Sequence, residues 1–321
     1  MTNLTKVNGT VPIISEDLLE STKGYVNSSR SDNTLKAYRS DLNHFTAWAS
    51  SHGLEALPAM PQTISLYLSD MARQGYKPST LERRLTAITQ AHKRSGIEFD
   101  RSHVLIKETM SGIKRTKGTA QDQKEALMTE DIRAMVQALP DNLLGLRDRA
   151  ILLLGFAGAF RRSELVGLDL DDLREEVQGL VAHLRRSKTD QEGEGRDIPI
   201  PYGHNPATCP VLAVQEWITA SGITSGPLFR GVDRHGNVSE TRLTDRAVAD
   251  IVKRSAKKAG LDPANYSGHS LRSGMATSAA RAGASERAIM EQTGHKSTAM
   301  VRKYIRKGHL WLDCAASVLG L

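Results

Sequence analysis

Apolar residues at helical spacing recur along almost the whole 321-residue chain, and this periodicity constrains the fold more than any other feature. Four such patterns come first, over residues 32–53, 62–73, 79–96 and 102–114. Because each pattern ends at or near a glycine or a polar turn, the segments read as separate helices rather than one long rod. We expect a small all-helical bundle over residues 21–115, preceded by a flexible arm over residues 1–20.

A polar stretch over residues 116–126 interrupts the helical patterns. It contains Gly118 and has no apolar period, which is typical of a linker. A second domain is expected over residues 127–321, and its helical patterns cover residues 129–139, 143–158, 209–220, 245–259, 270–281, 285–292 and 298–306. Apolar residues on both sides of a glycine-rich turn, within residues 177–201, predict a β-hairpin. The expected fold class is therefore mainly α, with a small antiparallel β-hairpin or sheet in the second domain.

The charge of the chain favours nucleic acid as a partner. The sequence has 43 Lys and Arg against 36 Asp and Glu, a formal net charge of +7. Residues 1–118 carry a net charge of +5 and residues 230–307 a net charge of +9, whereas residues 164–197 contain 10 acidic residues. The modest total thus conceals two basic regions of the kind that phosphate binding requires.

Several classes of protein are disfavoured by the sequence. The longest apolar run, residues 150–160, falls well short of the ~20 residues that a membrane-spanning helix needs, and no secretory signal is visible. Cys209 and Cys314 are too few for a disulfide framework, and no Cys/His cluster has metal-ligand spacing. Without a phosphate-binding glycine loop, ATP is not expected either. These features favour a reducing, intracellular compartment.

Two short motifs in the second domain pair an arginine with another functional side chain three residues away. Arg161 and Glu164 lie in Gly-Ala-Phe-Arg-Arg-Ser-Glu-Leu, and His269 and Arg272 lie in Ser-Gly-His-Ser-Leu-Arg. Each pair would share one face of a helix. Taken alone, Arg161 reads as an ordinary ion-pair partner of Glu164, and His269 reads as a helix cap or a core histidine.

A Gly-His pair ending at His295 and a tyrosine nine residues later, Tyr304, complete the pattern. Taken alone, Tyr304 would be a half-buried packing residue. Lys188 lies in the expected hairpin and is the only lysine between Lys124 and Lys253. The order of these residue types along the chain makes the functional interpretation stronger than any one motif does.

With these motifs the sequence resembles the tyrosine recombinases, the lambda-integrase family, over nearly its whole length. The motifs around Arg272 and Tyr304 look most like the Cre-type phage site-specific recombinases. The resemblance implies the tyrosine recombinase fold, in which a helical domain clasps DNA and a second domain is catalytic. Two departures are visible: Ala159 and Phe160 precede the first arginine where the family usually has Gly-Leu, and Ser273 stands where many relatives have a second histidine.

The resemblance implies a reaction on DNA and roles for several residues. Tyr304 would attack a phosphodiester and form a 3′-phosphotyrosyl link, and strand exchange would pass through a Holliday junction. Arg161 and Arg272 would bind the non-bridging oxygens, because guanidinium groups stay protonated and can bind two oxygens each. His295 would add a hydrogen bond to the phosphate.

Three further residues would handle protons and orientation. The family uses a hairpin lysine as the general acid for the 5′-oxygen, which here is Lys188. His269 would act as a base or orienting group beside the phosphate, and Glu164 would support the arginine and histidine side chains. No metal and no cofactor are implied.

The resemblance also implies partners. The chain would act on double-stranded DNA with a specific site built from palindromic arms, as a homotetramer on two DNA sites and without a membrane. The apolar segment 309–320 would form a C-terminal helix that docks into a neighbouring subunit. The protein would be cytoplasmic and associated with the nucleoid of a bacterial host. Candidate DNA-binding residues are Arg83, Arg84, Lys114, Arg115, Arg242, Arg246, Lys253 and Arg254.

Two alternatives to a recombinase stay open at this point. A type IB topoisomerase would use the same chemistry to relax supercoils without a tetramer. A non-catalytic DNA-binding relative would have lost the reaction, although every expected catalytic position here holds a competent residue type.

Overall fold

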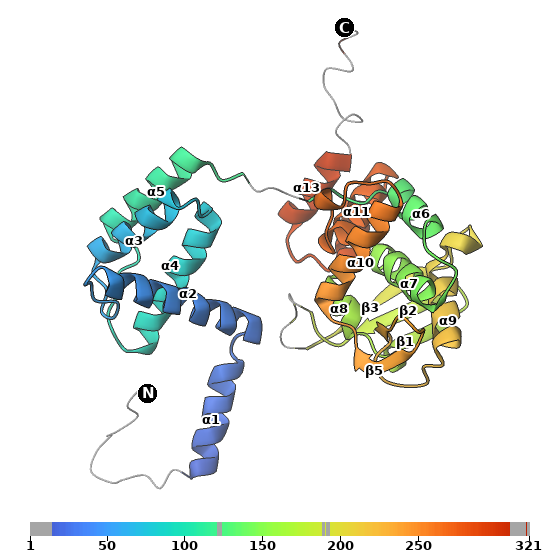
Figure 1. Cartoon of the computed structure of the whole chain (residues 1–321), viewed down its shortest axis with the longest axis horizontal. Helices are drawn as coiled ribbons and strands as arrows, with labels where there is room; N and C mark the ends of the chain where they lie inside the picture. Colours follow the sequence, from blue (N-terminus) through green and yellow to red (C-terminus); the bar gives the residue numbers. More distant parts are fainter. Residues whose placement is uncertain (1–14, 121–123, 188–189, 191–192, 309–318, 320–321) are drawn as a thin grey trace. The chain divides into compact units, whose positions relative to one another are not determined.

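The computed structural model describes residues 15–120, 124–187, 190, 193–308 and 319, and it divides into two units. The division falls between Asp122 and Gln123, inside the linker expected over residues 116–126. Each unit has its own hydrophobic core, so the two are described separately (Figure 1). Lys188, residues 1–14 of the expected arm and nearly all of the expected docking helix 309–320 lie outside the described residues.

The N-terminal unit is all-helical, as predicted. Its helices are α1 (Glu16–Ser28), α2 (Asp32–Ser51), α3 (Pro61–Arg73), α4 (Pro78–Arg94) and α5 (Val104–Lys117). Helix α1 corrects the prediction of a flexible arm, because residues 16–20 belong to it. The Ser15 hydroxyl accepts from the backbone N–H of Leu18, and two acidic residues stand in the first turn, so the helix start is stabilised without a strong apolar period.

The C-terminal unit contains the elements expected from the sequence and several more. Its helices are α6 (Thr129–Gln137), α7 (Leu143–Ala157), α8 (Arg162–Gly167), α9 (Pro210–Ser221), α10 (Asp245–Lys258), α11 (His269–Arg281), α12 (Glu286–Thr293) and α13 (Thr298–Gly308). Short 3-10 helices cover Leu170–Asp172, Pro206–Thr208 and Pro263–Asn265. Its strands are β1 (Leu173–Glu176), β2 (Gly179–Leu184), β3 (Arg196–Pro201), β4 (Arg230–Val232) and β5 (Val238–Arg242).

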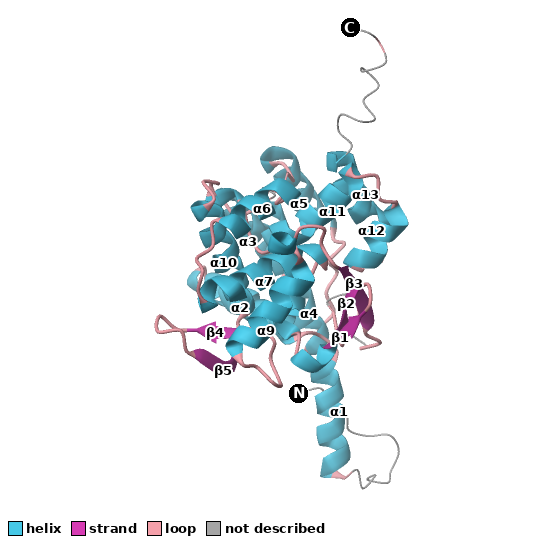
Figure 2. Ribbon diagram, turned by 90° about the vertical axis from the view of Figure 1, so that its right-hand side faces the viewer, coloured by secondary structure: helices cyan, strands magenta, loops and turns pink. Residues whose placement is uncertain are grey.

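The predicted hairpin is confirmed and is part of a larger sheet. Strands β2 and β3 pair antiparallel, with Gly179 opposite Pro201 and Leu184 opposite Arg196. Strand β1 adds to the other edge of β2, and β4 and β5 form a separate two-stranded sheet (Figure 2). Within the described residues these strands are all antiparallel.

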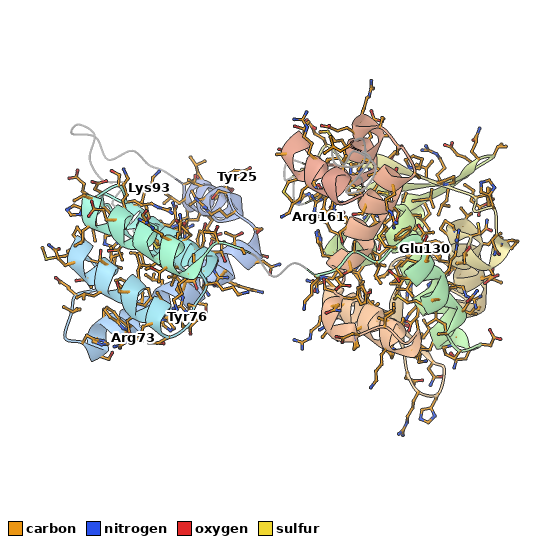
Figure 3. All side chains as sticks on the ribbon, turned by 90° about the horizontal axis from the view of Figure 1, so that it is seen from above. Tyr25, Arg73, Tyr76, Lys93, Glu130 and Arg161 are labelled. Atoms are coloured by element: carbon orange, nitrogen blue, oxygen red, sulfur yellow. The ribbon has the colours of Figure 1, made fainter. Side chains whose placement is uncertain are left out.

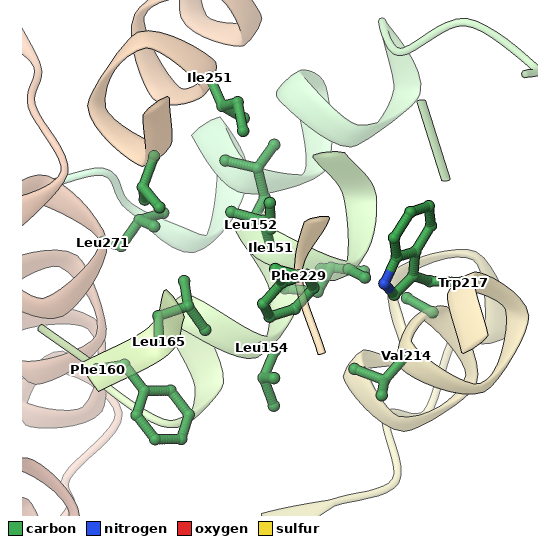
Figure 4. Packing of buried hydrophobic residues seen from close by; sticks show 14 of the residues in the cluster. Ile151, Leu152, Leu154, Phe160, Leu165, Val214, Trp217, Phe229, Ile251 and Leu271 are labelled. Atoms are coloured by element: carbon green, nitrogen blue, oxygen red, sulfur yellow. The ribbon is translucent and has the colours of Figure 1, made fainter. Parts of the chain in front are cut away.

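Helix α7 runs through the centre of the main core in the C-terminal unit. Its second half is apolar on all sides, and Arg147 and Asp148 in its first half are buried as an ion pair, as suits a helix inside a core. Ile151 and Leu154 of this helix are fully buried and belong to one cluster with Trp217, Phe229 and Leu271 (Figure 4). No helix among the described residues has the length and apolar character needed to cross a bilayer.

A smaller apolar cluster lies where helices α11, α12 and α13 meet. Ala276, Ala280, Ile289 and Val301 are buried there together with the ring of Tyr304. The alanines of α11 let α13 approach closely. This cluster fixes the helix that carries the proposed nucleophile.

Candidate active site

The first arginine motif forms a capped helix start rather than a pair on a helix face. Arg161 is the N-cap residue of α8, and Glu164 is at the third helical position. The Glu164 carboxylate accepts hydrogen bonds from the Arg161 backbone N–H at 2.8 Å and from its guanidinium Nη1 at 2.5 Å. The side chain of Glu164 is 2% exposed and that of Arg161 19% exposed. Glu164 therefore holds both the backbone and the guanidinium of Arg161, whose side chain stays partly open to solvent. Figure 3 labels Arg161 among the side chains of the C-terminal unit.

The second arginine, Arg272, ties three segments of the chain together. Its guanidinium is 1% exposed and donates to the carbonyl of Ala159 at 2.6 Å and to the carbonyl of Thr293. Ala159 has a φ of +49° and is the one non-glycine with positive φ in the described part of the chain. The bond from Arg272 holds this strained residue, and it places the two arginine motifs next to each other.

His295 lies directly beside Arg272. Its Nδ1 is 2.7 Å from the Thr293 hydroxyl, and its Nε2 is 3.3 Å from Nη2 of Arg272. The Thr293 hydroxyl donates to the carbonyl of Ile289 at 2.6 Å, so it must accept from His295. His295 is then protonated on Nδ1, and its Nε2 accepts from Arg272. In this arrangement neither nitrogen is free to donate to a phosphate, so the hydrogen bond expected from His295 stays a prediction. Burial first, and then the charge of Arg272, lowers the pKa of His295 to about 4, which keeps it neutral.

His269 and Tyr304 form the remaining pair of the site. His269 Nε2 is 3.2 Å from the hydroxyl oxygen of Tyr304, and the Tyr304 side chain is nearly buried, with 8% exposed. Burial raises the pKa of Tyr304, and Arg272 and Arg161 act against this rise. Burial also lowers the pKa of His269, followed by the charge of Arg272. A neutral histidine thus faces a neutral phenol, which is the arrangement of a base beside its nucleophile.

The structure therefore brings together six of the seven residues expected to be catalytic. These are Arg161, Glu164, His269, Arg272, His295 and Tyr304. The seventh, Lys188, lies outside the described residues, and its role stays a prediction. Ser273, where many relatives have histidine, donates back to the carbonyl of His269 at 3.1 Å, four residues earlier in the same helix. Among the residues described, no group of three or more His, Cys, Asp or Glu side chains is placed to hold a metal ion.

Two residues of this site have no sequence motif of their own. Thr293 orients His295 through its hydroxyl, and Arg196, the first residue of β3, donates from Nη1 to the carbonyl of Glu291 at 2.8 Å. A threonine and an arginine in these positions have no periodicity that would distinguish them from surface residues. Their roles are visible only in the folded chain, where Thr293 meets the His295 ring and Arg196 reaches α12 from the sheet.

The eight candidate DNA-binding residues fall into two groups. Arg115, Arg246 and Lys253 are exposed, and the described residues offer them no ion pair. The other five have partners: Arg83 with Asp41 at 2.8 Å, Arg84 with Tyr67 at 3.1 Å, Lys114 with Glu82 at 2.6 Å, Arg242 with the Val166 carbonyl at 2.6 Å, and Arg254 with Asp148 at 2.5 Å. For seven of these eight residues contact with DNA stays a prediction, and Arg84 is the exception.

The prediction that Arg84 binds DNA is wrong, because its side chain is buried. Its side chain is 7% exposed, its Nη1 donates to the Tyr67 hydroxyl at 3.1 Å, and its guanidinium carbon lies 4.2 Å from the centre of the Tyr76 ring. The buried carboxylate of Asp41 lies beside it and needs a cation nearby. Arg84 therefore belongs to the core of the N-terminal unit and does not reach DNA bases.

The neutral state of His295 predicts a loss of stability in acid. Because its pKa is about 4 in the folded protein and 6.5 ordinarily, the unfolded chain binds an extra proton between these values. The free energy of unfolding should therefore fall as the pH falls from 6.5 to 4. We expect the urea-unfolding midpoint to decrease more steeply over this range in the unmodified protein than in His295→Gln.

The matched control is His235→Gln, which removes an exposed histidine of the same unit. It should follow the unmodified protein at every pH. Identical pH dependence of the unmodified protein and His295→Gln would contradict a neutral, buried His295.

Comparison with known proteins accounts for both units. Residues 125–309 match the model of the phage integrase family, and residues 25–93 match the model of the phage integrase N-terminal SAM-like domain. The chain is 41% identical over 297 residues to an integrase/recombinase xerD homolog from Selenomonas ruminantium, covering 91% of this chain and 87% of the relative. It is 25% identical over 333 residues to the recombinase cre of Escherichia phage P1, with 95% of each chain covered. The similarity to a Xer-type protein is thus stronger than the expected similarity to the Cre type.

Solved structures show the same fold. A post-cleavage complex of the site-specific recombinase XerH with palindromic difH substrate superposes with a TM-score of 0.65 at 17% identity, covering 96% of this chain and 85% of that one. The Tn1549 transposon integrase bound to transposon right-end DNA gives a TM-score of 0.63 at 16% identity, covering 89% and 93%. These likenesses establish the mainly helical recombinase fold. Together with the matched motifs and relatives, they show that the chain belongs to the phage integrase family and is a tyrosine recombinase, an enzyme that cuts and rejoins DNA.

Proposed function

We propose that Tyr304 is the nucleophile and cuts one DNA strand at a time through a 3′-phosphotyrosyl intermediate. The observation that carries this proposal is the 3.2 Å contact between His269 Nε2 and the Tyr304 hydroxyl, beside two converging arginines. In the forward step the Tyr304 oxygen bonds to phosphorus and the bond to the 5′-oxygen breaks. The 5′-hydroxyl of the partner strand later reverses this step, which passes the strands through a Holliday junction.

The two arginines would stabilise the charge that develops on the phosphate. Arg272 stays protonated at neutral pH because burial lowers its pKa only to about 10. Its donors are held in place before the reaction, and Glu164 does the same for Arg161. Donors that are already oriented stabilise a transition state without paying for reorganisation during the reaction.

Proton transfer divides between two residues in this proposal. The phenol proton of Tyr304 passes toward neutral His269 as the new bond to phosphorus forms. Lys188 protonates the departing 5′-oxygen. The phosphotyrosyl bond conserves the energy of the phosphodiester, so the reaction needs no ATP, metal or cofactor.

We also propose that four copies act together on two DNA sites with palindromic arms. The XerH structure contains palindromic difH DNA, and a lambda integrase structure contains a dimer on a core site. The chain offers an apolar groove of about 570 Å³ for a neighbour, lined by residues such as Leu180, Ile200, Ala279, Ala288 and Ile289. The apolar segment 309–320 of a second copy is the proposed occupant. Acting on DNA, the protein would reside with the nucleoid in the bacterial cytoplasm.

Substitutions on both sides of this contact test the assembly. Ala288→Glu places a charge in the groove and Trp311→Glu places one in the proposed occupant, so each should reduce tetramers on DNA at least about tenfold. Val177→Glu is the control, because Val177 is 94% exposed and does not line the groove. Sedimentation of protein–DNA complexes measures the outcome. If both Ala288→Glu and Trp311→Glu form tetramers normally, the contact between the groove and segment 309–320 is excluded.

Covalent capture tests the function itself. The full-length protein is incubated with sheared genomic DNA from its bacterial host, and protein-linked fragments are precipitated with detergent and sequenced. We expect enrichment of one sequence with palindromic arms, linked to a peptide that contains Tyr304. Adducts without enrichment, together with relaxation of plasmids and no joining of two sites, would favour a topoisomerase. The absence of any adduct would favour a non-catalytic DNA-binding protein.

A further inference from the structure

Arg196 connects the hairpin sheet to the helix that precedes His295. It is the first residue of β3 and stands opposite Leu184 of β2. Its Nη1 donates to the carbonyl of Glu291 at 2.8 Å and to the carbonyl of Gln292 at 3.3 Å. These carbonyls lie in the last turn of α12, where they have no partner within the helix and favour a cation. A guanidinium from the sheet thus caps the carboxyl end of α12.

The glycine before His295 is shaped to receive this guanidinium. Gly294 ends α12 with a φ of +65°, a left-handed conformation that side chains rarely adopt. A Cβ at Gly294 would lie 2.8 Å from the guanidinium carbon of Arg196, which is closer than a Cβ contact allows. Arg196 therefore packs directly on the backbone of the turn that carries His295.

A second contact joins the same two elements, but it does not reach His295. The Gln292 amide donates to the carbonyl of Ala157 at 2.9 Å and to the carbonyl of Pro199 at 3.2 Å. This contact holds α12 against α7 and β3. The turn itself is held from two sides, by Arg196 at the end of α12 and by the bond from Arg272 to the carbonyl of Thr293.

The other terminal nitrogen of Arg196, Nη2, faces the side of the first arginine motif without a partner of its own among the described residues. It is buried, although a buried donor ordinarily finds a hydrogen-bond partner. Burial lowers the pKa of Arg196, Glu164 raises it and Arg161 lowers it, so the pair of the first arginine motif lies within electrostatic reach.

We infer that Arg196 is a positioning residue that holds the turn of residues 293–295, so that His295 and Arg272 keep their arrangement. The inference rests on the proposed function and adds a residue to it. Through Gly294 it fixes His295, whose Nε2 is 3.3 Å from Nη2 of Arg272. Arg272 in turn holds Ala159 and the first arginine motif. Arg196 acts through these groups and does not itself touch the phosphate.

Single-turnover cleavage of a nicked DNA fragment recovered by covalent capture tests this inference. Arg196→Gln should slow formation of the adduct by about 10- to 100-fold, the range found for residues that orient a reacting group. Arg196→Lys should recover part of the rate, because an ammonium can bind one carbonyl of α12 but cannot cover Gly294. Arg287→Gln is the control: it removes an 89% exposed guanidinium from α12 and should cleave like the unmodified protein.

A double-mutant cycle separates positioning from a loss of stability. If Arg196 acts through His295, Arg196→Gln should cost little in a protein that already carries His295→Ala. A DNA substrate with sulfur in place of the 5′-oxygen separates it from Lys188, since a thiolate leaves without a proton. That substrate should restore cleavage by Lys188→Ala but not by Arg196→Gln.

The outcomes are distinguishable. No adduct with the unmodified protein would overturn the proposed function rather than the role of Arg196. Three results would overturn the inference. These are cleavage by Arg196→Gln at the normal rate, full restoration of its cleavage by the sulfur substrate, and a loss of rate that adds to that of His295→Ala. If Arg196→Gln does not fold, Arg196→Lys is carried through the same three comparisons and decides in the same way.

Discussion

Replacement of Tyr304 by phenylalanine is expected to abolish covalent linkage to DNA, lowering the cleavage rate by at least about 10⁴-fold. The change removes only the oxygen that would bond to phosphorus. The ring keeps its place among Ala276, Ala280, Ile289 and Val301, so the fold should be preserved. The lost contact with His269 should change the free energy of unfolding by about 1 kcal/mol at most.

DNA affinity should change little in Tyr304→Phe, because the cations that bind phosphate stay. A gel-shift titration and a denaturing-gel assay for adducts, run on the same fragment, give the two quantities. Tyr202→Phe is the matched control, since Tyr202 is an exposed tyrosine of the same unit. An adduct formed by Tyr304→Phe would assign the nucleophile to another residue.

Arg272→Lys is expected to lower the cleavage rate nearly as much as Tyr304→Phe does. It should also lower the free energy of unfolding. Lysine keeps the positive charge but cannot donate to the carbonyls of both Ala159 and Thr293. Leaving buried carbonyls without a donor should lower the free energy of unfolding by about 2–4 kcal/mol. Loss of an oriented donor to the phosphate should slow cleavage by about 10³-fold. Urea unfolding and single-turnover cleavage measure the two effects.

Arg281→Lys serves as the control for Arg272→Lys. Arg281 is exposed in the last turn of the same helix, so its replacement should leave both quantities near those of the unmodified protein. Normal cleavage by Arg272→Lys would show that a charge at this position suffices and that the geometry of the guanidinium is unimportant. A loss confined to DNA affinity would reduce Arg272 to a phosphate anchor.

The helices could be predicted from the sequence because apolar periodicity reports burial directly. This holds for α7, whose second half is apolar on every side, and for the hairpin of β2 and β3. Strand β1 escaped prediction because its residues, Leu-Arg-Glu-Glu, are mostly exposed at the sheet edge. Helix α1 escaped because its cap and acidic first turn, rather than its apolar residues, mark its start.

The catalytic residues were predictable because their types and order along the chain match a known family. The contacts that hold these residues in place were not predictable, since they depend on backbone groups. The carbonyl of Ala159 and the turn at Gly294 have no signature in the sequence, yet Arg272 and Arg196 depend on them. The burial of Arg84 was equally hidden, because basic residues on a helix look alike until their partners are known.

The acidic run over residues 164–197 also acquires a structural reason. Asp169 and Asp172 accept hydrogen bonds from Arg185 at 3.0 and 2.7 Å, and Asp169 also pairs with Arg242. These carboxylates neutralise arginines inside the unit. Asp169 thus offsets the charge of Arg242, one of the candidate DNA-binding residues, while Asp172 acts on Arg185.

The division of the chain into two units has a consequence for binding strength. Lys124 and Glu125 are hydrogen-bonded to the C-terminal unit, so the tether after α5 is residues 118–123, which can span at most roughly 25 Å. Once one unit has bound a duplex, the tether keeps the other at an effective concentration in the millimolar range. Two surfaces that are weak when separate would then bind the duplex tightly together. Lengthening the tether would weaken binding without altering a single contact.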